Sequence, residues 1–273
     1  MLPLEDGYGD IIGKAMRGLG VMDLDLSQAT KLSIAEVRAA RGGEFDEHAA
    51  SKIAKALNLN PAALLESGSK NWYPHAANIL GVYQLTSPFG GDMTVNCYII
   101  WDPANGEAAL FDTGTHPSTI LNFLDEKKLS LKYIFITHTH GDHIDCLPQV
   151  QIASGAPTFV HKNGDIGGVK LFDWGDKFQF GTLTVETRQT TGHAADGTTF
   201  VISGLEKTVA VVGDAVFAGS MGGGAVSYRE ALTTNLQNIY SLPDDTLLCP
   251  GHGPLTTIAL EKIHNPFYYP GSK

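Results

Sequence analysis

The spacing of apolar residues along the chain changes near residue 79. Before that point, apolar residues recur every three or four positions, as on one face of an amphipathic helix, most clearly in the stretch 47–57. After it, short runs of β-branched and aromatic residues alternate with turn-forming residues, which is typical of strands. The pattern predicts a helical domain over residues 1–70, followed by an α/β domain over residues 71–273.

Capping signals divide the first segment into five short helices. Ser33 and Glu36 form a capping box ahead of the third helix, and Asp46 caps the fourth. Asn60 followed by Pro61 is a cap with proline at the first helical position, and it opens the fifth helix. The helices are expected at residues 9–19, 23–30, 34–41, 47–57 and 61–66.

A polar, turn-rich linker over residues 68–78 precedes the strands. Beyond it, apolar runs bounded by glycine, proline or asparagine predict strands, and two longer stretches predict helices. A glycine at position 181 separates two of these strands, which are expected to form a hairpin. The strands are expected at 82–86, 95–101, 108–111, 132–136, 158–161, 177–180, 183–187, 208–212 and 246–249, and the helices at 117–128 and 145–154.

The strongest chemical signal lies in residues 132–143, KYIFITHTHGDH. An apolar strand ends there in four groups that can bind metal: His138, His140, Asp142 and His143. If the strand stays extended, its period of two places the first two histidines on the same side, and a turn at Gly141 brings the other two groups to a second point. Burial of four such groups without a partner would be costly, so the run predicts two adjacent metal positions. Imidazole and carboxylate suit zinc, iron or manganese.

Three further candidates are His193, Asp214 and His252, each of which follows an apolar run and stands beside a glycine. Alone, a histidine or aspartate after a strand is usually a cap or an ordinary hydrogen-bonding residue. In a layered α/β fold, however, such strand ends converge on one edge, which favours a shared site. The histidines expected to be structural or surface residues are His48, His75, His116, His161 and His264.

Composition narrows the classes of function. The formal net charge of −10 argues against general attraction to nucleic acid or to anionic membranes. No apolar run approaches the roughly 18 residues that span a bilayer. The N-terminal residues are acidic where a signal peptide would be basic, and the three cysteines are too far apart in sequence to suggest a disulfide framework. We therefore expect a cytoplasmic protein without a membrane partner.

With these residues identified, the chain resembles the metallo-β-lactamase superfamily, and within it the glyoxalase II-like (hydroxyacylglutathione hydrolase-like) hydrolases. The resemblance covers about residues 79–268 and implies an αββα sandwich with metal ions at one edge of the two sheets. Its motifs are FDTG (111–114), THTHGDH (137–143), TGH (191–193), VVGDAVFAGS (211–220) and LPDDTLLCPGHGPLTT (242–257).

The resemblance implies a binuclear centre of two divalent ions, with zinc as the first choice and iron or manganese as alternatives. Asp214 would bridge the two ions, and Asp112 would orient a ligand histidine through a hydrogen bond. A hydroxide bridging the metals, beside Asp142, would attack a carbonyl carbon. The remaining implied ligands are His138, His140 and His193 for the first ion, and Asp142, His143 and His252 for the second.

The reaction implied by the resemblance is hydrolysis of a thioester of glutathione or a related thiol. Zinc β-lactamases, as a family, carry cysteine or serine where Asp214 stands, which disfavours β-lactam hydrolysis. The loop from Met221 to Gly224 lacks the cysteine and arginine of many relatives, and the glutathione-binding helical domain has no counterpart in the sequence, so the thiol stays open. The alternatives with similar motifs are a lactonase and a persulfide dioxygenase.

Residues 11–66 resemble a Cro/C1-type helix-turn-helix domain, with Leu26 at an apolar position, Ile34 and Val37 at its core positions, and Lys31 where its turn usually has glycine. A hypothesis of another class is therefore a ligand-sensing, DNA-binding regulator. Residues 1–70 hold 10 acidic and 8 basic residues, and the third helix offers DNA only two arginines, at 38 and 41. DNA binding is therefore less favoured than a packing or dimerisation role, and we expect a homo-oligomer with the helical domain as its candidate contact.

Overall fold

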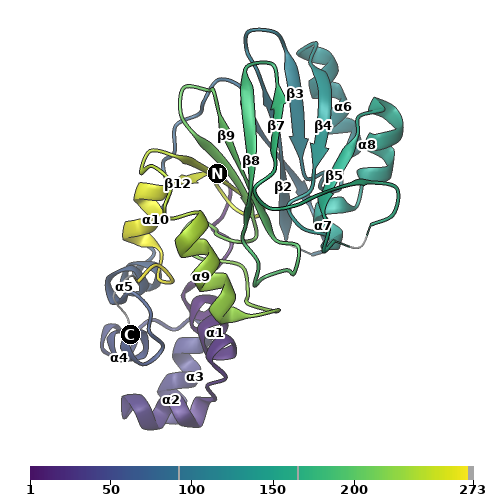
Figure 1. Ribbon diagram of the computed structural model, residues 1–273. Helices are drawn as coiled ribbons and strands as arrows, with labels where there is room; N and C mark the ends of the chain where they lie inside the picture. The colour runs from purple at the N-terminus through teal and green to yellow at the C-terminus, as the bar shows by residue number, and fades with distance from the viewer. Residues whose placement is uncertain (92, 165, 270–273) are drawn as a thin grey trace.

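The computed structural model describes residues 1–91, 93–164 and 166–269. Two six-stranded sheets pack face to face, helices cover their outer faces, and a bundle of helices sits at one end of the sandwich (Figure 1). This is the αββα sandwich with a preceding all-α bundle that the sequence predicts, and the predicted fold class is confirmed.

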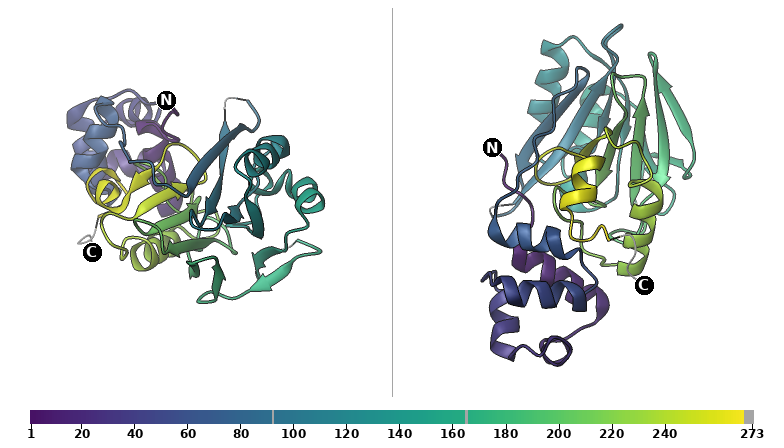
Figure 2. Two further views of the ribbon diagram at one scale, coloured as in Figure 1. Left: turned by 90° about the horizontal axis from the view of Figure 1, so that it is seen from above. Right: turned by 90° about the vertical axis from the view of Figure 1, so that its left-hand side faces the viewer.

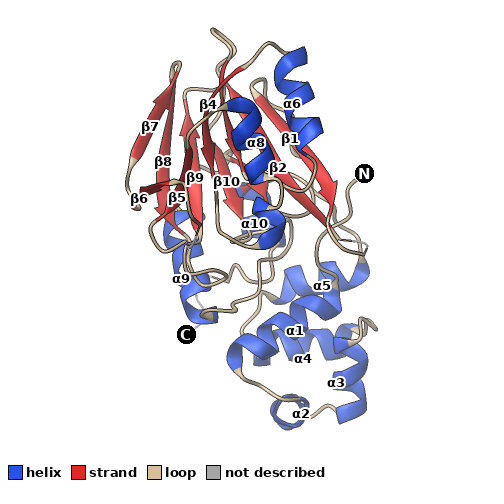
Figure 3. Ribbon diagram, turned by 90° about the vertical axis from the view of Figure 1, so that its right-hand side faces the viewer, coloured by secondary structure: helices blue, strands red, loops and turns tan. Residues whose placement is uncertain are grey.

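The first sheet has the strand order β1-β2-β3-β4-β5-β6. Its first two strand pairs are antiparallel, whereas β3 to β6 run parallel. Parallel neighbours need crossover connections, and α6 (Pro117–Glu126) and α8 (Leu147–Ser154) form them on the outer face (Figure 3). The strands are β1 (Val82–Pro88), β2 (Thr94–Trp101), β3 (Glu107–Phe111), β4 (Ser130–Phe135), β5 (Thr158–His161) and β6 (Lys170–Phe172).

The second sheet has the strand order β12-β11-β10-β9-β8-β7, and its β10 and β11 are parallel. Two helices, α9 (Tyr228–Asn238) and α10 (Ile258–His264), lie on the opposite side of the sandwich from α6 and α8 (Figure 1). The strands are β7 (Lys177–Phe180), β8 (Leu183–Gln189), β9 (Thr198–Ser203), β10 (Val209–Gly213), β11 (Leu247–Pro250) and β12 (Thr256–Thr257).

Aromatic rings fill the space between the two sheets. Phe111 and Phe135 come from the first sheet and Phe200 from the second, all fully buried, with ring centroids 5.1–5.4 Å apart. Aromatic pairs at this separation add to the hydrophobic contribution of burial. This layer fixes the distance between the sheets, and with it the edge at which their strand ends meet.

The five helices of the bundle follow the capping signals in the sequence. Ser33 and Asp46 accept hydrogen bonds from the first turns of α3 and α4, and Asn60 does so for α5, so these three predicted caps are confirmed. Lys31 ends α2 in the left-handed conformation (φ 58°), so the turn keeps its shape without glycine. The prediction that Ile34 lies in the core is wrong, because it is 37% exposed. The helices are α1 (Tyr8–Leu19), α2 (Asp23–Thr30), α3 (Ile34–Arg41), α4 (Glu47–Ala56) and α5 (Pro61–Ser69).

The bundle shares a hydrophobic core with the sandwich, below which it lies in the right-hand view of Figure 2. Met221, Tyr228 and Phe267 pack into the same cluster as the apolar residues of α1, α4 and α5. Trp72, in the linker, stacks on His264 of α10 at a centroid distance of 4.7 Å. The junction is thus a packed interface between the helical segment and the second sheet.

The two arginines of α3 both pair with one carboxylate. Arg38 Nε lies 2.9 Å from Asp23 Oδ2, and Arg41 Nη1 lies 2.7 Å from Asp23 Oδ1. An acidic group between the two cations weakens the field that would attract a phosphate backbone. Among the described residues, no helix is long and apolar enough to cross a bilayer.

Several elements differ from the sequence-based expectations. The pattern gives no indication of β6, β9, β12, α9 or α10. In β9, TTFVIS, every residue but the last is buried, polar ones included, so the sequence lacks the alternation of a half-exposed strand. In α9, threonine and asparagine occupy buried positions, and hydrogen bonds to the loops beneath replace an apolar stripe.

The aromatic layer makes a prediction about stability. We expect Phe200→Ala to lower the free energy of unfolding by about 3–5 kcal/mol, because it leaves a cavity between the sheets. Chemical denaturation of the metal-free protein measures this change. The matched control is Ile152→Ala, at a residue 86% exposed, which should change stability by no more than about 0.5 kcal/mol. Equal effects of the two substitutions would contradict the assigned core.

Candidate metal centre

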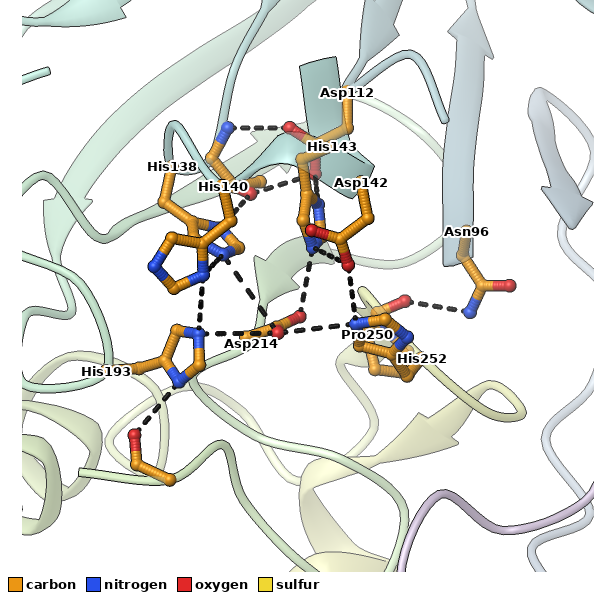
Figure 4. Close-up of polar contacts among 12 residues, drawn as sticks. Asn96, Asp112, His138, His140, Asp142, His143, His193, Asp214, Pro250 and His252 are labelled. Atoms are coloured by element: carbon orange, nitrogen blue, oxygen red, sulfur yellow. Dashed lines mark hydrogen bonds and ion pairs between the residues drawn. The ribbon is translucent and has the colours of Figure 1, made fainter. Parts of the chain in front are cut away.

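The predicted ligand residues meet at one edge of the sandwich (Figure 4). The loop after β4 and the short helix α7 (Gly141–Ile144) carry four of them. Asp214 follows β10, His193 follows β8, and His252 follows β11. Strand ends from both sheets therefore supply the cluster, as the sequence predicts for a layered fold.

The local geometry after β4 differs from the prediction in one respect. The strand ends at Phe135, before the first histidine, so an extended strand does not place His138 and His140. Gly141 does not form a left-handed turn; it begins the single helical turn of α7, with His140 as the preceding cap residue. The helical turn, and not a glycine turn, separates Asp142 and His143 from His138 and His140. The two neighbouring metal positions that the sequence predicts can therefore still form.

One group of ligand atoms consists of three imidazoles. His140 Nδ1 lies 3.1 Å from His138 Nε2 and 3.1 Å from His193 Nε2. Each neutral imidazole has one proton to donate, so hydrogen bonds alone explain this convergence poorly. Three ring nitrogens within 4.8 Å of one another form a ligand set suited to a cation.

The second group combines a carboxylate with two imidazoles. His252 Nε2 lies 3.3 Å from Asp142 Oδ2, and His143 Nε2 lies 3.7 Å from the same oxygen. These three ligand atoms also lie within 4.8 Å of one another. The two groups lie side by side, since the rings of His138 and His143 are 4.2 Å apart.

Asp214 lies between the two groups. Its Oδ2 atom is 3.4 Å from His193 Nε2 in the first group and 3.3 Å from His252 Nε2 in the second. Its Oδ1 atom is 3.3 Å from His143 Nε2. A carboxylate in this place can contact two cations at once, which is the position expected of a bridging ligand.

Contacts outside the cluster fix how the histidines face it. His143 Nδ1 is 2.8 Å from Asp112 Oδ2, which is the contact expected for Asp112. His193 Nδ1 donates to the Gly223 carbonyl, and His252 Nδ1 donates to the Thr94 carbonyl. Because each Nδ1 atom is held by an oxygen, each Nε2 atom is left to face the cluster, as in histidine metal sites generally.

His138 is oriented through Thr137. The Thr137 hydroxyl donates to Asp112 Oδ2 over 2.8 Å and lies 3.0 Å from His138 Nδ1. The Thr137 amide donates to the other Asp112 oxygen over 2.7 Å. Asp112 itself has a positive φ of 58°, a conformation that side-chain hydrogen bonding makes tolerable for aspartate. One carboxylate therefore orients histidines in both groups.

Burial and charge give the ligands different proton affinities. Burial lowers the pKa of His143, but the Asp112 and Asp214 carboxylates outweigh it and raise that pKa to about 10. Burial likewise lowers the pKa of His252, while hydrogen bonds to Asp142 and Asp214 raise it to about 11. Burial raises the pKa of Asp214, but His143 and His252 together outweigh it and hold that pKa well below its usual value.

The first group behaves in the opposite way. Burial lowers the pKa of His138, and the neighbouring His143 lowers it further. Burial also lowers the pKa of His193, and the Asp214 charge offsets only part of this effect. Without metal, then, His143 and His252 carry protons at neutral pH, whereas His138 and His193 offer neutral nitrogens.

The residues present fit a pair of divalent cations. His143 Nε2 and Asp214 Oδ1 are buried and lie 3.3 Å apart, but neither makes a hydrogen bond among the described residues. Such orphaned groups are costly unless a ligand satisfies them. The cluster offers imidazole and carboxylate ligands, which suit zinc, iron and manganese alike.

Several residues of this centre have no clear signal in the sequence. Gly251 and Gly222 lie against Asp214, where an added Cβ would approach Asp214 Oδ1 to 2.2 Å and the Asp214 carbonyl oxygen to 2.0 Å. The loop of Met221 to Gly224 is thus more than a connection, because its backbone packs on two ligands. Asn96, fully buried, donates to the carbonyls of Pro250 and Gly253 and so holds the loop of His252 (Figure 4).

The remaining histidines lie outside the cluster, as expected. His48, His75 and His116 are exposed. His161 is buried and stacks on Trp174 at 3.8 Å, so its role is one of packing. The three cysteines are free and buried, and Cys146 donates to the Thr113 carbonyl beneath the site.

With the geometry established, comparison with known proteins identifies the family. A family model described as the metallo-beta-lactamase superfamily matches residues 90–252. The chain belongs to this superfamily. The assignment supports a metal-dependent hydrolase that uses divalent cations. The family model begins at residue 90, so the Cro/C1-type resemblance of residues 11–66 stays a prediction.

Relatives of the chain come from several bacteria. The probable metallo-hydrolase YqgX of Bacillus subtilis is 26% identical over 204 residues, 65% of this chain and 93% of that protein. A hydroxyacylglutathione hydrolase of Methylobacterium sp. is 33% identical over 159 residues, 56% of this chain and 60% of that protein. The crystal structure of ETHE1 from Myxococcus xanthus has a TM-score of 0.60 and 27% identity, covering 68% of this chain and 83% of that one.

The bridging position of Asp214 makes a prediction about metal content. We expect the wild-type protein to bind two divalent ions per chain and Asp214→Asn to lose at least one, because the amide neutralises the charge between the two groups. Elemental analysis after purification without chelators measures this. Asp125→Asn, at an exposed position on α6, is the control and should keep the wild-type content. Full occupancy in the Asp214 variant would contradict the bridging role.

The raised pKa values predict proton release on metal binding. His143 and His252 are protonated below their pKa values of about 10 and 11, so metal at neutral pH must displace a proton from each. Affinity of the second group should therefore rise with pH, and loading at pH 7.5 should release about two protons. Calorimetry in buffers of different ionisation enthalpy counts them. A metal affinity independent of pH between 6 and 9 would show that these histidines are not ligands.

Proposed function

We propose that this protein is a binuclear metal-dependent hydrolase of thioesters, similar in reaction to glyoxalase II. The observation that carries the proposal is Asp214 between the two ligand groups, with contacts to histidines of both. The 33% identity to a hydroxyacylglutathione hydrolase supports the thioester as substrate class. The similarity to YqgX supports metal-dependent hydrolysis without naming a substrate.

The chemistry follows from the ligand arrangement. Two divalent ions held here would lower the pKa of a shared water to near neutrality and offset the charge that develops on the carbonyl oxygen. Asp142, whose side chain is 13% exposed, would help to hold the second ion and would accept a hydrogen bond from its water. The buried contacts of Asp112 and the Gly223 carbonyl keep the imidazoles from turning during the reaction.

The proposed reaction balances without any further reactant. The oxygen of water bonds to the thioester carbonyl carbon, the carbon–sulfur bond breaks, and the sulfur takes up a proton. The products are a carboxylic acid and a thiol. No serine or cysteine nucleophile takes part, which agrees with the burial of all three cysteines and with the raised pKa of the Cys249 thiol.

Turnover of a thioester tests the proposal directly. Metal-loaded protein should hydrolyse S-lactoylglutathione, and His138→Ala should lower kcat/KM by about a hundredfold or more, because it removes a ligand of the first group. Release of thiol is followed with a thiol-reactive dye, and Asp125→Asn serves as the control. Two bound ions without thioester turnover would reject the substrate class while leaving the metal centre intact.

Assays on the same metal-loaded protein distinguish the alternative functions. Hydrolysis of a lactone in place of the thioester would favour a lactonase. Consumption of oxygen with glutathione persulfide, by iron-loaded protein, would favour a persulfide dioxygenase. The regulator hypothesis is not favoured, because Arg38 and Arg41 are both paired with Asp23. Salt-dependent, sequence-specific DNA binding by the full chain would revive it.

A further inference from the structure

The N-terminal segment, residues 2–6, runs beside the loop that carries His252. A Cβ atom added to Gly253 would lie 3.4 Å from the Pro3 carbonyl oxygen and 3.4 Å from the Glu5 amide nitrogen. In the close-up, the purple N-terminal ribbon passes near this loop (Figure 4). The segment lies outside residues 90–252, the part of the chain that the family model matches.

Contacts on both sides of Glu5 hold the segment in place. On one side, the Tyr73 hydroxyl donates to the Leu2 carbonyl over 2.8 Å. On the other, Asp6 pairs with Lys14 of α1 and accepts a hydrogen bond from the Ser220 hydroxyl. These contacts tie the segment to the linker, to the bundle and to the loop after β10, so that Glu5 has a defined position.

A chain of side-chain contacts connects Lys14, the partner of Asp6, to the candidate metal ligand His252. Lys14 Nζ lies 5.1 Å from the centroid of the Phe217 ring, and that ring meets the edge of His252 at 5.6 Å. Lys14 also donates to the Met221 carbonyl over 2.8 Å. Lys14 forms its ion pair with Asp6 and not with Glu5, although its charge also acts on Glu5.

Glu5 is itself without a partner. Among the interactions of the described residues, its carboxylate accepts no hydrogen bond and forms no ion pair, although the residue is only partly exposed. The Glu5 Cβ atom lies 3.9 Å from the position that a Cβ atom of Gly253 would take, which places the residue beside the loop of His252. Burial raises the pKa of Glu5, and the charge of His252 lowers it. A carboxylate without a partner of its own acts through its charge on a group bound beside His252.

We infer that Glu5 selects the substrate by charge, favouring a cationic or neutral group near the scissile bond over an anionic one. The inference rests on the proposed hydrolytic function and narrows its substrate class. It also bears on the leaving thiol: Glu5 would repel a thiol that carries a carboxylate and attract one that carries an ammonium group. The thioester of glutathione, which is anionic, should then be hydrolysed with a lower kcat/KM than a cationic thioester.

A matched series of acetyl thioesters tests this selection in the full-length, metal-loaded protein. The leaving thiols are thiocholine (cationic), N-acetylcysteamine (neutral) and 3-mercaptopropionate (anionic). Glu5→Gln removes one charge while keeping the size of the side chain. The ratio of kcat/KM for the cationic over the anionic thioester should fall about tenfold in this variant, as expected when one unit charge near a protein surface is removed. Most of the change should lie in KM, and it should shrink at high salt.

Glu126→Gln, an exposed substitution at the far end of α6, is the control and should leave the ratio unchanged. An unchanged ratio in Glu5→Gln, with normal turnover of the neutral thioester, would overturn the inference and leave the thioesterase proposal standing. If no thioester is hydrolysed at all, that proposal fails, and calorimetric binding of the corresponding S-methyl thioethers still decides the role of Glu5. Tighter binding of the cationic thioether that is lost in Glu5→Gln supports the inference, and equal binding of both thioethers overturns it.

Discussion

The Asp214 carboxylate, buried between two sets of histidines, is the interaction on which the rest of the structure depends. A buried carboxylate is stable only beside positive charge, and here the imidazoles of four histidines lie within 4.0 Å of its oxygens. Both sheets must deliver their strand ends to that point, so the spacing of the sandwich, set by the layer of Phe111, Phe135 and Phe200, is also the spacing of the site. The packing that holds the two sheets together therefore also places the candidate ligand residues.

Around that carboxylate, the backbone does as much positioning as the side chains. The Gly223 and Thr94 carbonyls hold two imidazoles, and Gly222 and Gly251 allow the chain to pass close to Asp214. Asp112 reaches histidines of both groups, one directly and one through Thr137. The centre is thus built from a ring of fixed acceptors, which explains how seven ligand residues from four separate segments share one geometry.

Much of this could be predicted from the sequence, because the ligand residues follow apolar strands and strand ends converge in layered folds. The caps at Ser33, Asp46 and Asn60 were predictable for a similar reason, since capping depends on residues a few positions apart. The contacts of Thr94, Gly222 and Asn96 were not, because each joins segments more than a hundred residues apart or involves only backbone atoms. The strand β9 escaped prediction because burial on both faces removes the alternation by which a strand is recognised.

The loop of Met221 to Gly223 contacts both the helical bundle and the candidate metal centre. Met221 packs in the hydrophobic core of the helical bundle, and its carbonyl accepts a hydrogen bond from Lys14, while two residues later the Gly223 carbonyl holds His193. Docking of the bundle and ordering of His193 are therefore thermodynamically linked through these three residues. If His193 holds a cation, any free energy that the docked bundle contributes to ordering this histidine would also appear as tighter docking of the bundle when the cation binds. A partner that engaged the bundle would therefore act on the metal centre without approaching it.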